Sequence, residues 1–226
     1  MPIPIRAPLS VLALALLGAP AAHAGDMDMP MGKTARYRVE FERSWSSESH
    51  PQDFPLLAHF SPVIGATHDG SYEIFPNGKL ATAGLEKLCE EGKHQPLDAE
   101  IRAAVQKGAA GALIETPDPL RSVPEKATAT FEIDAAHPMV SIAAMIAPSP
   151  DWCAVAAGVS LQENGQWVAK KTIALEAWDV GTDSATSYRA LDDDTQPHGP
   201  IQLNDSPYFV KAGKRVPVGS VTFVRQ

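Results

Sequence analysis

Two aspartates in one short loop are the first residues of this sequence that could do chemistry. Asp179 and Asp183 lie in "WDVGTDS" (178–184), four positions apart with a glycine between them, directly after an apolar, strand-like run. Four structures would account for such a pair: a solvated turn, the start of a helix, a catalytic acid/base pair, or a cation site. The choice depends on which other residues the fold brings to this loop.

A predicted β-hairpin brings a third aspartate to the same place. The dipeptide Asn-Gly (164–165) lies between two strand-like runs, and a two-residue type I′ turn favours this dipeptide because both of its positions need positive φ. With the dipeptide at the tip, Asp151 is predicted to face Trp178, next to Asp179. We therefore expect Asp151, Asp179 and Asp183 to lie close together at one end of the sheet.

These three carboxylates predict a calcium site. Like charges in a small volume repel one another, and either protonation or a bound cation must relieve them. Oxygen ligands on flexible loops suit Ca²⁺ better than zinc, which prefers nitrogen and sulfur, or Mg²⁺, which demands stricter geometry. The spacing is not that of an EF-hand, and two alternatives stay open. The aspartates could simply cap backbone N–H groups in turns, or Asp179 and Asp183 could be a catalytic pair, as two carboxylates are in glycosidases.

Other motifs offer weaker chemistry. His50, His59 and His68 recur every nine residues, but nothing fixes them on one face, and a three-histidine zinc site needs tight convergence. We expect surface or hydrogen-bonded histidines instead. The acidic run at 190–200 is expected to be a solvated loop. The sequence contains neither a G-x-S-x-G nucleophile elbow nor a glycine-rich phosphate loop.

Strands are the elements expected to carry these residues. Residues 35–43 alternate between apolar and charged side chains, as a half-buried antiparallel strand does, whereas 139–147 is apolar on both faces, as in a central strand. Helical periodicity appears only between 83 and 108, in two stretches that end at glycines. Further strands are predicted at 128–134, 153–162, 167–178 and 221–225. This pattern predicts an all-β fold, an antiparallel β-sandwich with a small helical insertion.

The beginning of the chain has the pattern of a secretory signal peptide. Arg6 supplies a positive start, "LSVLALALLGA" is a short apolar core, and "AHA" (22–24) is a small-residue cleavage site. The apolar run is too short to span a bilayer. We expect residues 1–24 to be removed and 25–34 to form a disordered, methionine-rich leader. The mature chain, residues 35–226 of which would form the folded domain, is therefore expected to be secreted or periplasmic.

Sulfur atoms offer two further possibilities. The leader contains Met27, Met29 and Met31, whose thioethers could hold Cu(I) in an exported protein, although a disordered terminus is the expected state of this segment. The two cysteines are Cys89 and Cys153. In an oxidising compartment they could pair and close a long loop, but the sequence alone does not show that their sulfurs lie close together.

The net charge narrows the class of partner. The chain has 19 basic and 27 acidic residues, a net charge of −8, and removal of the signal peptide with its one arginine makes this −9. An acidic surface disfavours nucleic acid and anionic lipid, and it favours cations or basic partners. No later segment is apolar and long enough to span a membrane. We expect neither nucleic-acid binding nor membrane insertion.

At this point the motifs resemble a known family. "APSPDW" (147–152), followed by "WDVGTDS" (178–184), resembles paired motifs of the spondin N-terminal domain found in F-spondin and mindin. The segment 37–92, with Trp45, "HPQDFP" and "HFSPVIGATH", is similar to the opening of that domain, and "SPYFVKAGKRVPVGSVTFVR" (206–225) resembles its closing strand. The resemblance covers essentially the whole mature chain.

The resemblance implies a C2-like β-sandwich that binds one calcium ion in loops at one end, with Asp151, Asp179 and Asp183 as ligands. Because animal members of the family are secreted matrix or adhesion modules, it also implies recognition of an extracellular protein or glycan rather than catalysis. A hydrolase that uses the three aspartates is the alternative. The sequence departs from the family at Cys153, where a large aromatic residue is usual. A disulfide to Cys89 could then replace packing beside the metal loop.

Overall fold

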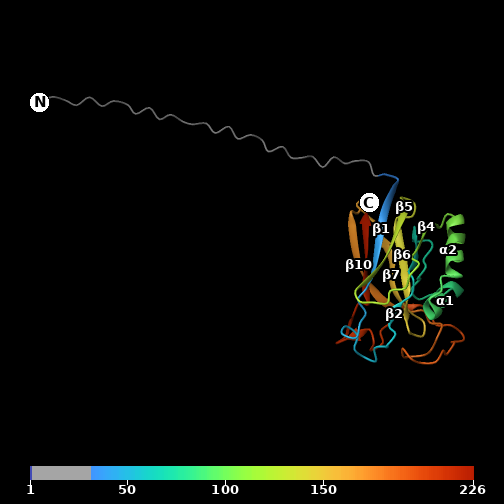
Figure 1. The fold of residues 1–226 in the computed structure, drawn as a ribbon. Helices are drawn as coiled ribbons and strands as arrows, with labels where there is room; N and C mark the ends of the chain where they lie inside the picture. The colour runs from blue at the N-terminus through green and yellow to red at the C-terminus, as the bar shows by residue number, and fades with distance from the viewer. Residues whose placement is uncertain (2–31) are drawn as a thin grey trace. The chain divides into compact units, whose positions relative to one another are not determined.

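Antiparallel strands are the main secondary structure of the computed structural model, which describes Met1 and residues 32–226 (Figure 1). Residues 2–31 lie outside the described residues, and with them nearly all of the predicted signal peptide and leader, including the three leader methionines. The helices are α1 (Ala83–Glu91) and α2 (Leu97–Gln106). The strands are β1 (Thr34–Arg43), β2 (His59–Phe60), β3 (Ile64–His68), β4 (Ala110–Glu115), β5 (Glu125–Asp134), β6 (Met139–Ala147), β7 (Trp152–Ser160), β8 (Gln162–Glu163), β9 (Gln166–Trp167), β10 (Lys170–Asp179), β11 (Gln202–Leu203), β12 (Val210–Lys211), β13 (Lys214–Arg215) and β14 (Gly219–Arg225).

Most of the described strands belong to one sheet that nearly closes on itself. Its main path runs β4-β3-β6-β7-β10-β14-β1-β5, with β2 paired to β6 and β11 paired to β10. The two edge strands, β4 and β5, lie against each other, so the sheet wraps around an interior. The predicted all-β, C2-like antiparallel β-sandwich with a small helical insertion is confirmed.

The main hydrophobic core fills the interior of this sandwich. On β1 the predicted alternation is confirmed, with Tyr37, Val39 and Phe41 buried, because successive side chains of a strand point to opposite faces. Neighbouring strands add aromatic residues to the same layer: Phe223 of β14 lies opposite Val39, and Phe131 of β5 lies opposite Tyr37.

A second, smaller core explains why β6 is apolar on both faces. Ile142 of β6 faces the main core, whereas Ala143 belongs to a core between the sheet and the two helices. Leu88 of α1 and Ile101 of α2 are fully buried in this second core. In Figure 1 the two helices lie together along one side of the sheet, and they bury the apolar faces that the sequence predicted.

A disulfide ties α1 to the sheet. Cys89 of α1 and Cys153 of β7 form it, with their Cα atoms 5.4 Å apart, and both residues are fully buried. The helix itself begins where the Thr82 side chain accepts a hydrogen bond from the Leu85 N–H and ends at Gly92, which has a left-handed conformation. The sequence left this pairing open. In the structure the bond links α1 to β7 inside the second core.

The hairpin is correctly placed, but its predicted register is wrong at the base. Gln162 pairs with Trp167 at the tip, as expected from Asn-Gly in the turn. At the base Trp178 pairs with Cys153 instead of Asp151, a shift of two residues. The physical reason is that the strands separate between tip and base: the first part of β10 pairs with β14, and β10 rejoins β7 only at Glu176.

The chain enters and leaves the domain at the end opposite this base. β1 and β14 are antiparallel neighbours, and the Gln226 N–H donates to the Arg36 carbonyl at the start of β1. The label for the C-terminus in Figure 1 lies beside the start of β1. None of the helices in the described part of the chain is long and apolar enough to cross a membrane.

Candidate metal centre

The three predicted aspartates meet at the base of the β7–β10 hairpin. Asp151 immediately precedes β7, Asp179 is the last residue of β10, and Asp183 lies in the loop that follows. The N–H of Val180 donates to the backbone carbonyl of Asp151 at 3.4 Å, which continues the pairing of the two segments. The hairpin places the three residues at the same end of the sheet, with Asp151 opposite Val180 rather than Trp178.

The Asp151 carboxylate is fully buried, and only one of its two oxygens has hydrogen-bond partners. Its Oδ2 accepts hydrogen bonds from the N–H groups of Thr182 at 2.8 Å and Asp183 at 3.3 Å. Its Oδ1 is buried and has no hydrogen-bond partner. A buried carboxylate oxygen without a partner is costly, so this atom is the position in the site where a further group is most needed.

The other two carboxylates are held by short local hydrogen bonds. The Oδ1 of half-buried Asp179 accepts from the Gly181 N–H at 3.0 Å. The Oδ1 of buried Asp183 accepts from the Ala185 N–H at 2.7 Å, and its Oδ2 accepts from the Asp193 N–H at 3.2 Å. Side chains that bond to their own turns in this way hold a fixed loop shape, which agrees with the turn-capping alternative without excluding a cation.

A second loop crosses the "WDVGTDS" segment and holds it in place. The Thr195 N–H donates to the Thr182 carbonyl at 2.9 Å, and the Gly199 N–H donates to the Gly181 carbonyl at 2.7 Å. Gly181 has φ of +76°, and a Cβ added there would lie 2.4 Å from the Gly199 carbonyl oxygen. Only glycine satisfies both requirements, so Gly181 sets the close crossing of the two loops.

Mutual repulsion and burial disfavour the charged form of these acids. Burial, followed by the nearby Asp179 carboxylate, raises the pKa of Asp151 to about 7, against the opposing effect of its two N–H donors. Burial and the Asp183 carboxylate likewise raise the pKa of Asp179. No ion pair among residues 32–226 includes Asp151, Asp179 or Asp183. The cluster therefore has no internal positive charge to offset its own.

The acids do not by themselves form a closed metal cage. Within the described part of the chain, no three or more His, Cys, Asp or Glu side chains are grouped so that they could hold a metal ion. The donor chemistry nonetheless fits a hard cation, because the three side chains present only oxygen and the buried Asp151 Oδ1 has no partner. A calcium ion here would need further oxygen ligands, from backbone carbonyls or water.

Two acids outside the predicted set lie beside this cluster. Glu90 follows the disulfide cysteine on α1, and burial raises its pKa. Asp192 belongs to the acidic run, and the neighbouring Asp183 carboxylate raises its pKa. The run is exposed, as predicted, but its backbone also contacts Asp183. The signal that could have found Glu90 is its position next to Cys89, once the disulfide is known.

The three histidines at nine-residue spacing do not form a site. His50 lies 3.2 Å from the Val216 carbonyl and His59 lies 2.8 Å from the Leu57 carbonyl, each through a ring nitrogen. His68 is buried at the end of β3, where its Nε2 lies 2.8 Å from Ser141 Oγ of β6. The expectation of separate, hydrogen-bonded histidines is confirmed.

Aromatic side chains pack on the other side of the same end of the sandwich. We call Trp45, Trp152, Tyr188, Tyr208 and Phe209 the aromatic cluster. The ring centroids of Trp152 lie 5.3 Å from Tyr188 and 5.4 Å from Phe209, and those of Tyr188 and Tyr208 lie 4.6 Å apart. Such offset and edge-to-face contacts stabilise beyond simple burial. Trp152 is thus a packing residue, 2% exposed in the main core.

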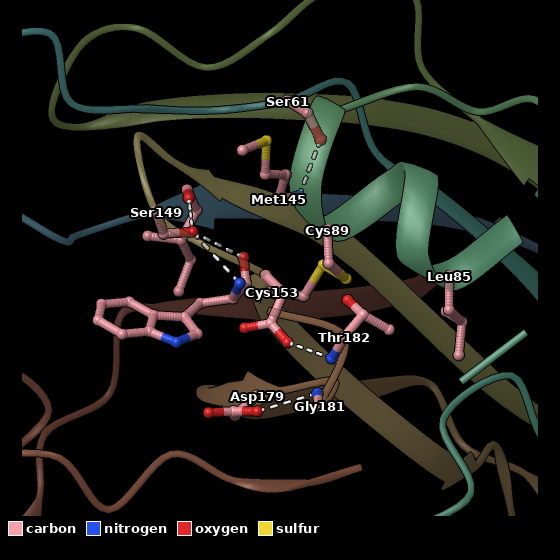
Figure 2. Close-up of a disulfide and its surroundings, with 12 residues drawn as sticks. Ser61, Leu85, Cys89, Met145, Ser149, Cys153, Asp179, Gly181 and Thr182 are labelled. Carbon is pink, nitrogen blue, oxygen red and sulfur yellow. Dashed lines mark hydrogen bonds between the residues drawn. A yellow bond between two sulfur atoms is a disulfide. The ribbon is translucent and has the colours of Figure 1, made fainter. Parts of the chain in front are cut away.

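The disulfide and the acidic loop are close neighbours. Figure 2 shows the Cys89–Cys153 bond beside Thr182, with Gly181 and Asp179 next along the loop. On the other side of the disulfide, Ser149 fixes the turn before β7: its Oγ accepts from the Trp152 N–H at 3.2 Å. The segment that carries Asp151 is therefore held by the Ser149 hydrogen bond before it and by the disulfide at Cys153 after it.

Comparison with known proteins identifies the family. The family model Spondin_N matches residues 35–211. Spondin-1 of Xenopus laevis is 32% identical over 207 residues, covering 85% of this chain and 25% of the relative, and Spondin-1 of Homo sapiens is 33% identical over 206 residues, covering 84% and 24%. Spondin-2 of Rattus norvegicus is 29% identical over 231 aligned positions, covering 96% of this chain and 70% of the relative.

The match to Spondin-1 therefore spans about a quarter of the length of that protein. The family-model match lies over the sandwich and includes both aspartate segments, 147–152 and 178–184. Because the family model covers most of the chain, the chain belongs to the spondin N-terminal domain family.

Proposed function

We propose that this chain is a recognition or adhesion module that works outside the cytoplasm and whose loops at one end are ordered by a single Ca²⁺ ion. Membership of the spondin family supports a module of extracellular recognition. The ligands of the ion would be Asp151, Asp179 and Asp183. The partner would be an extracellular protein or glycan.

One observation carries the calcium part of the proposal: the unpartnered, buried Oδ1 of Asp151. The same carboxylate uses its other oxygen to fix two backbone N–H groups of the "WDVGTDS" loop. A cation at Oδ1 would remove the cost of the unpaired oxygen and the repulsion from Asp179 at the same time. The loop that Asp151 already holds would then be fixed on both sides.

Calcium is the cation that the surroundings favour. The three carboxylates offer oxygen without nitrogen or sulfur, and two of them lie on loops whose backbone carbonyls could add ligands. Ca²⁺ accepts six to eight such oxygens in variable geometry, whereas Mg²⁺ requires a near-octahedral set. When bound, the ion would neutralise the acidic loops and hold them in the shape presented to a partner.

Thermal unfolding of the mature domain in EDTA and in excess Ca²⁺ tests this proposal. A ligand that binds the folded state alone raises stability by an amount set by its concentration relative to Kd, about 2.7 kcal/mol at a hundredfold excess. We expect Ca²⁺ to raise the melting temperature of the wild type and of the control Asp118→Asn, which changes an exposed aspartate in another loop. The shift should be absent in Asp183→Asn.

An unchanged melting curve for the wild type, with Ca²⁺ or with EDTA, would refute the calcium site. The hydrolase alternative stays a prediction and has its own readout. Turnover of a glycan or ester substrate by the wild type, lost in Asp183→Asn, would replace the recognition proposal with an enzymatic one.

A further inference from the structure

A second acidic feature opens beside the proposed calcium site. It is a pocket of about 270 Å³ between the end of α1, the turn before β7 and the two crossing loops. The acidic residues that line it are Glu90, Glu91, Asp183 and Asp192. Glu90 and Asp192 take no part in the proposed calcium site, so the pocket adds chemistry that the calcium proposal does not use.

The charges of this pocket are not balanced. The basic residue in its lining is Lys87, whose Nζ lies 2.7 Å from Glu91 Oε1 and 3.7 Å from Glu86 Oε1. Lys87 is thereby paired along the helix with Glu91. No ion pair of the described residues includes Glu90 or Asp192. The pocket therefore presents three carboxylates that lack a positive partner, those of Glu90, Asp183 and Asp192.

A buried hydroxyl provides an independent sign that a ligand group is missing. Thr182 is fully buried, and its Oγ1 has no hydrogen-bond partner. The hydroxyl lies near the carboxylate of Glu90 without forming a hydrogen bond of ordinary geometry. In Figure 2 it points away from the loop, towards the disulfide and α1. Leaving a buried hydroxyl without a hydrogen-bond partner costs free energy. A further polar group at this place would supply that partner.

The shape of the pocket favours an organic cation over a metal ion. Its volume is far larger than a single metal ion needs, and its acids are not grouped tightly enough to coordinate one. A guanidinium presents five donors in a planar fork and pairs with more than one carboxylate at once. Such charge-assisted hydrogen bonds are stronger than neutral ones.

We propose that the pocket between α1 and the crossing loops binds a basic side chain of a protein partner, an arginine by preference, through Glu90, Asp183 and Asp192. This inference rests on the recognition function proposed above and names the chemistry of its partner. Asp183 belongs to both features, so the basic side chain would dock against the loop that calcium orders. The disulfide next to Glu90 holds α1 at the distance that the pocket requires.

An NMR titration of the ¹⁵N-labelled mature domain with short peptides tests the proposal. The probe is acetyl-Gly-Arg-Gly-amide, and its matched control carries citrulline, which is neutral and has nearly the same shape, in place of arginine. Both are added at saturating Ca²⁺. We expect the arginine peptide to cause saturable shifts confined to the ends of α1 and β10 and to the 190–200 loop, and the citrulline peptide to cause none.

Variants separate this inference from the calcium proposal. The pair Glu90→Gln with Asp192→Asn leaves Asp151, Asp179 and Asp183 intact, so it should abolish the peptide shifts while the calcium-dependent rise in melting temperature remains. Glu132→Gln, which removes one exposed charge from β5, should bind the peptide like the wild type. An unchanged amide spectrum outside the pocket would show that the double variant is folded.

Three results would overturn the inference: equal shifts with citrulline, binding that survives the double variant, or no saturable shifts with a calcium effect still present. The last result would leave the calcium proposal standing. Calorimetric titration covers the metal alternative, since two bound Ca²⁺ ions in the wild type and one in the double variant would make the pocket a metal site instead.

Discussion

Two halves of the same end of the sandwich are built on opposite principles. The aromatic cluster begins at Trp152 and is closed by ring-to-ring contacts, whereas the acidic cluster begins at the preceding residue, Asp151, and contains a buried oxygen without a partner. One loop serves both, because Tyr188 packs into the aromatic cluster and Asp193 binds Asp183. The aromatic half also buries two polar atoms without a partner, Trp45 Nε1 and the Tyr188 hydroxyl, but both are neutral, whereas the acidic half gathers carboxylates that repel one another.

Removing a large side chain from the aromatic cluster should have the largest effect on stability. Trp45 is fully buried, with Phe54, Phe60 and Tyr188 around its ring at 4.9 to 6.0 Å. Trp45→Ala should lower the free energy of unfolding by about 3–5 kcal/mol, measured by urea denaturation. The loss should be the same in Ca²⁺ and in EDTA. A loss that calcium largely reverses would show that the two halves are not independent.

The disulfide is the covalent support of the acidic half, and removing it should have the next largest effect. Cys89→Ala combined with Cys153→Ala frees a link between residues 64 apart and should cost about 2–4 kcal/mol. The calcium-dependent rise in melting temperature should also shrink, because Asp151 lies two residues from Cys153. Wild-type protein treated with a reducing agent serves as the second measurement. An undiminished calcium effect in both samples would separate the disulfide from the site.

Asp151→Asn should have opposite effects with and without calcium. In EDTA at pH 8 the amide removes a buried charge and its repulsion with Asp179, so stability should rise by roughly 1–3 kcal/mol. In excess Ca²⁺ the variant should be less stable than the wild type, because one ligand is lost. Chemical denaturation under the two conditions gives both numbers. A variant less stable than the wild type in EDTA would mean that the acidic half is satisfied without a cation.

The buried imidazole of His68, whose two nitrogens both have hydrogen-bond partners, should have a smaller effect on stability that does not depend on calcium. His68 Nε2 lies 2.8 Å from Ser141 Oγ, and its Nδ1 accepts from the Gly70 N–H at 3.1 Å. Burial lowers the pKa of this imidazole below its unfolded value of 6.5. Below pH 6.5 the unfolded chain therefore takes up a proton that the folded chain does not, and stability falls as the pH is lowered.

Between pH 7.5 and pH 5, proton uptake by His68 in the unfolded chain should lower the free energy of unfolding by about 1–2 kcal/mol. The measurement is the difference in this free energy between wild type and His68→Gln at each pH. Burial also lowers the pKa of His50, so the variant should lose part of the pH dependence and keep the rest. His59→Gln changes a histidine whose Nδ1 lies 2.8 Å from the carbonyl of Leu57, two residues earlier in the chain, and serves as the control. A pH dependence unchanged in His68→Gln would contradict the assignment.

Local patterns predicted the elements well, and the contacts between elements only in part. The alternation of β1 and the Asn164-Gly165 turn follow from short-range rules, and both are present. The register at the hairpin base was missed because β10 leaves β7 for β14 before returning, and no local pattern reports that change of partner.

The same limit explains what was missed in the site. The three aspartates were found because one hairpin connects them. Glu90 was not found because it reaches the site through the packing of α1 on the sheet and through a disulfide whose partners the sequence alone could not pair. Contacts that depend on how a helix lies on a sheet require the structure.

The neighbouring positions of β1 and β14 also determine how the domain responds to mechanical force. Tension applied between the two ends of the domain acts on antiparallel neighbours at the end where Gln226 bonds to Arg36. The ladder bonds lie perpendicular to the strands, so such a pull opens them one after another from that end, like a zipper, instead of loading them together in shear. Force would therefore reach the acidic loops, at the opposite end, last, and an adhesive contact made there would outlast the first opening of the sheet.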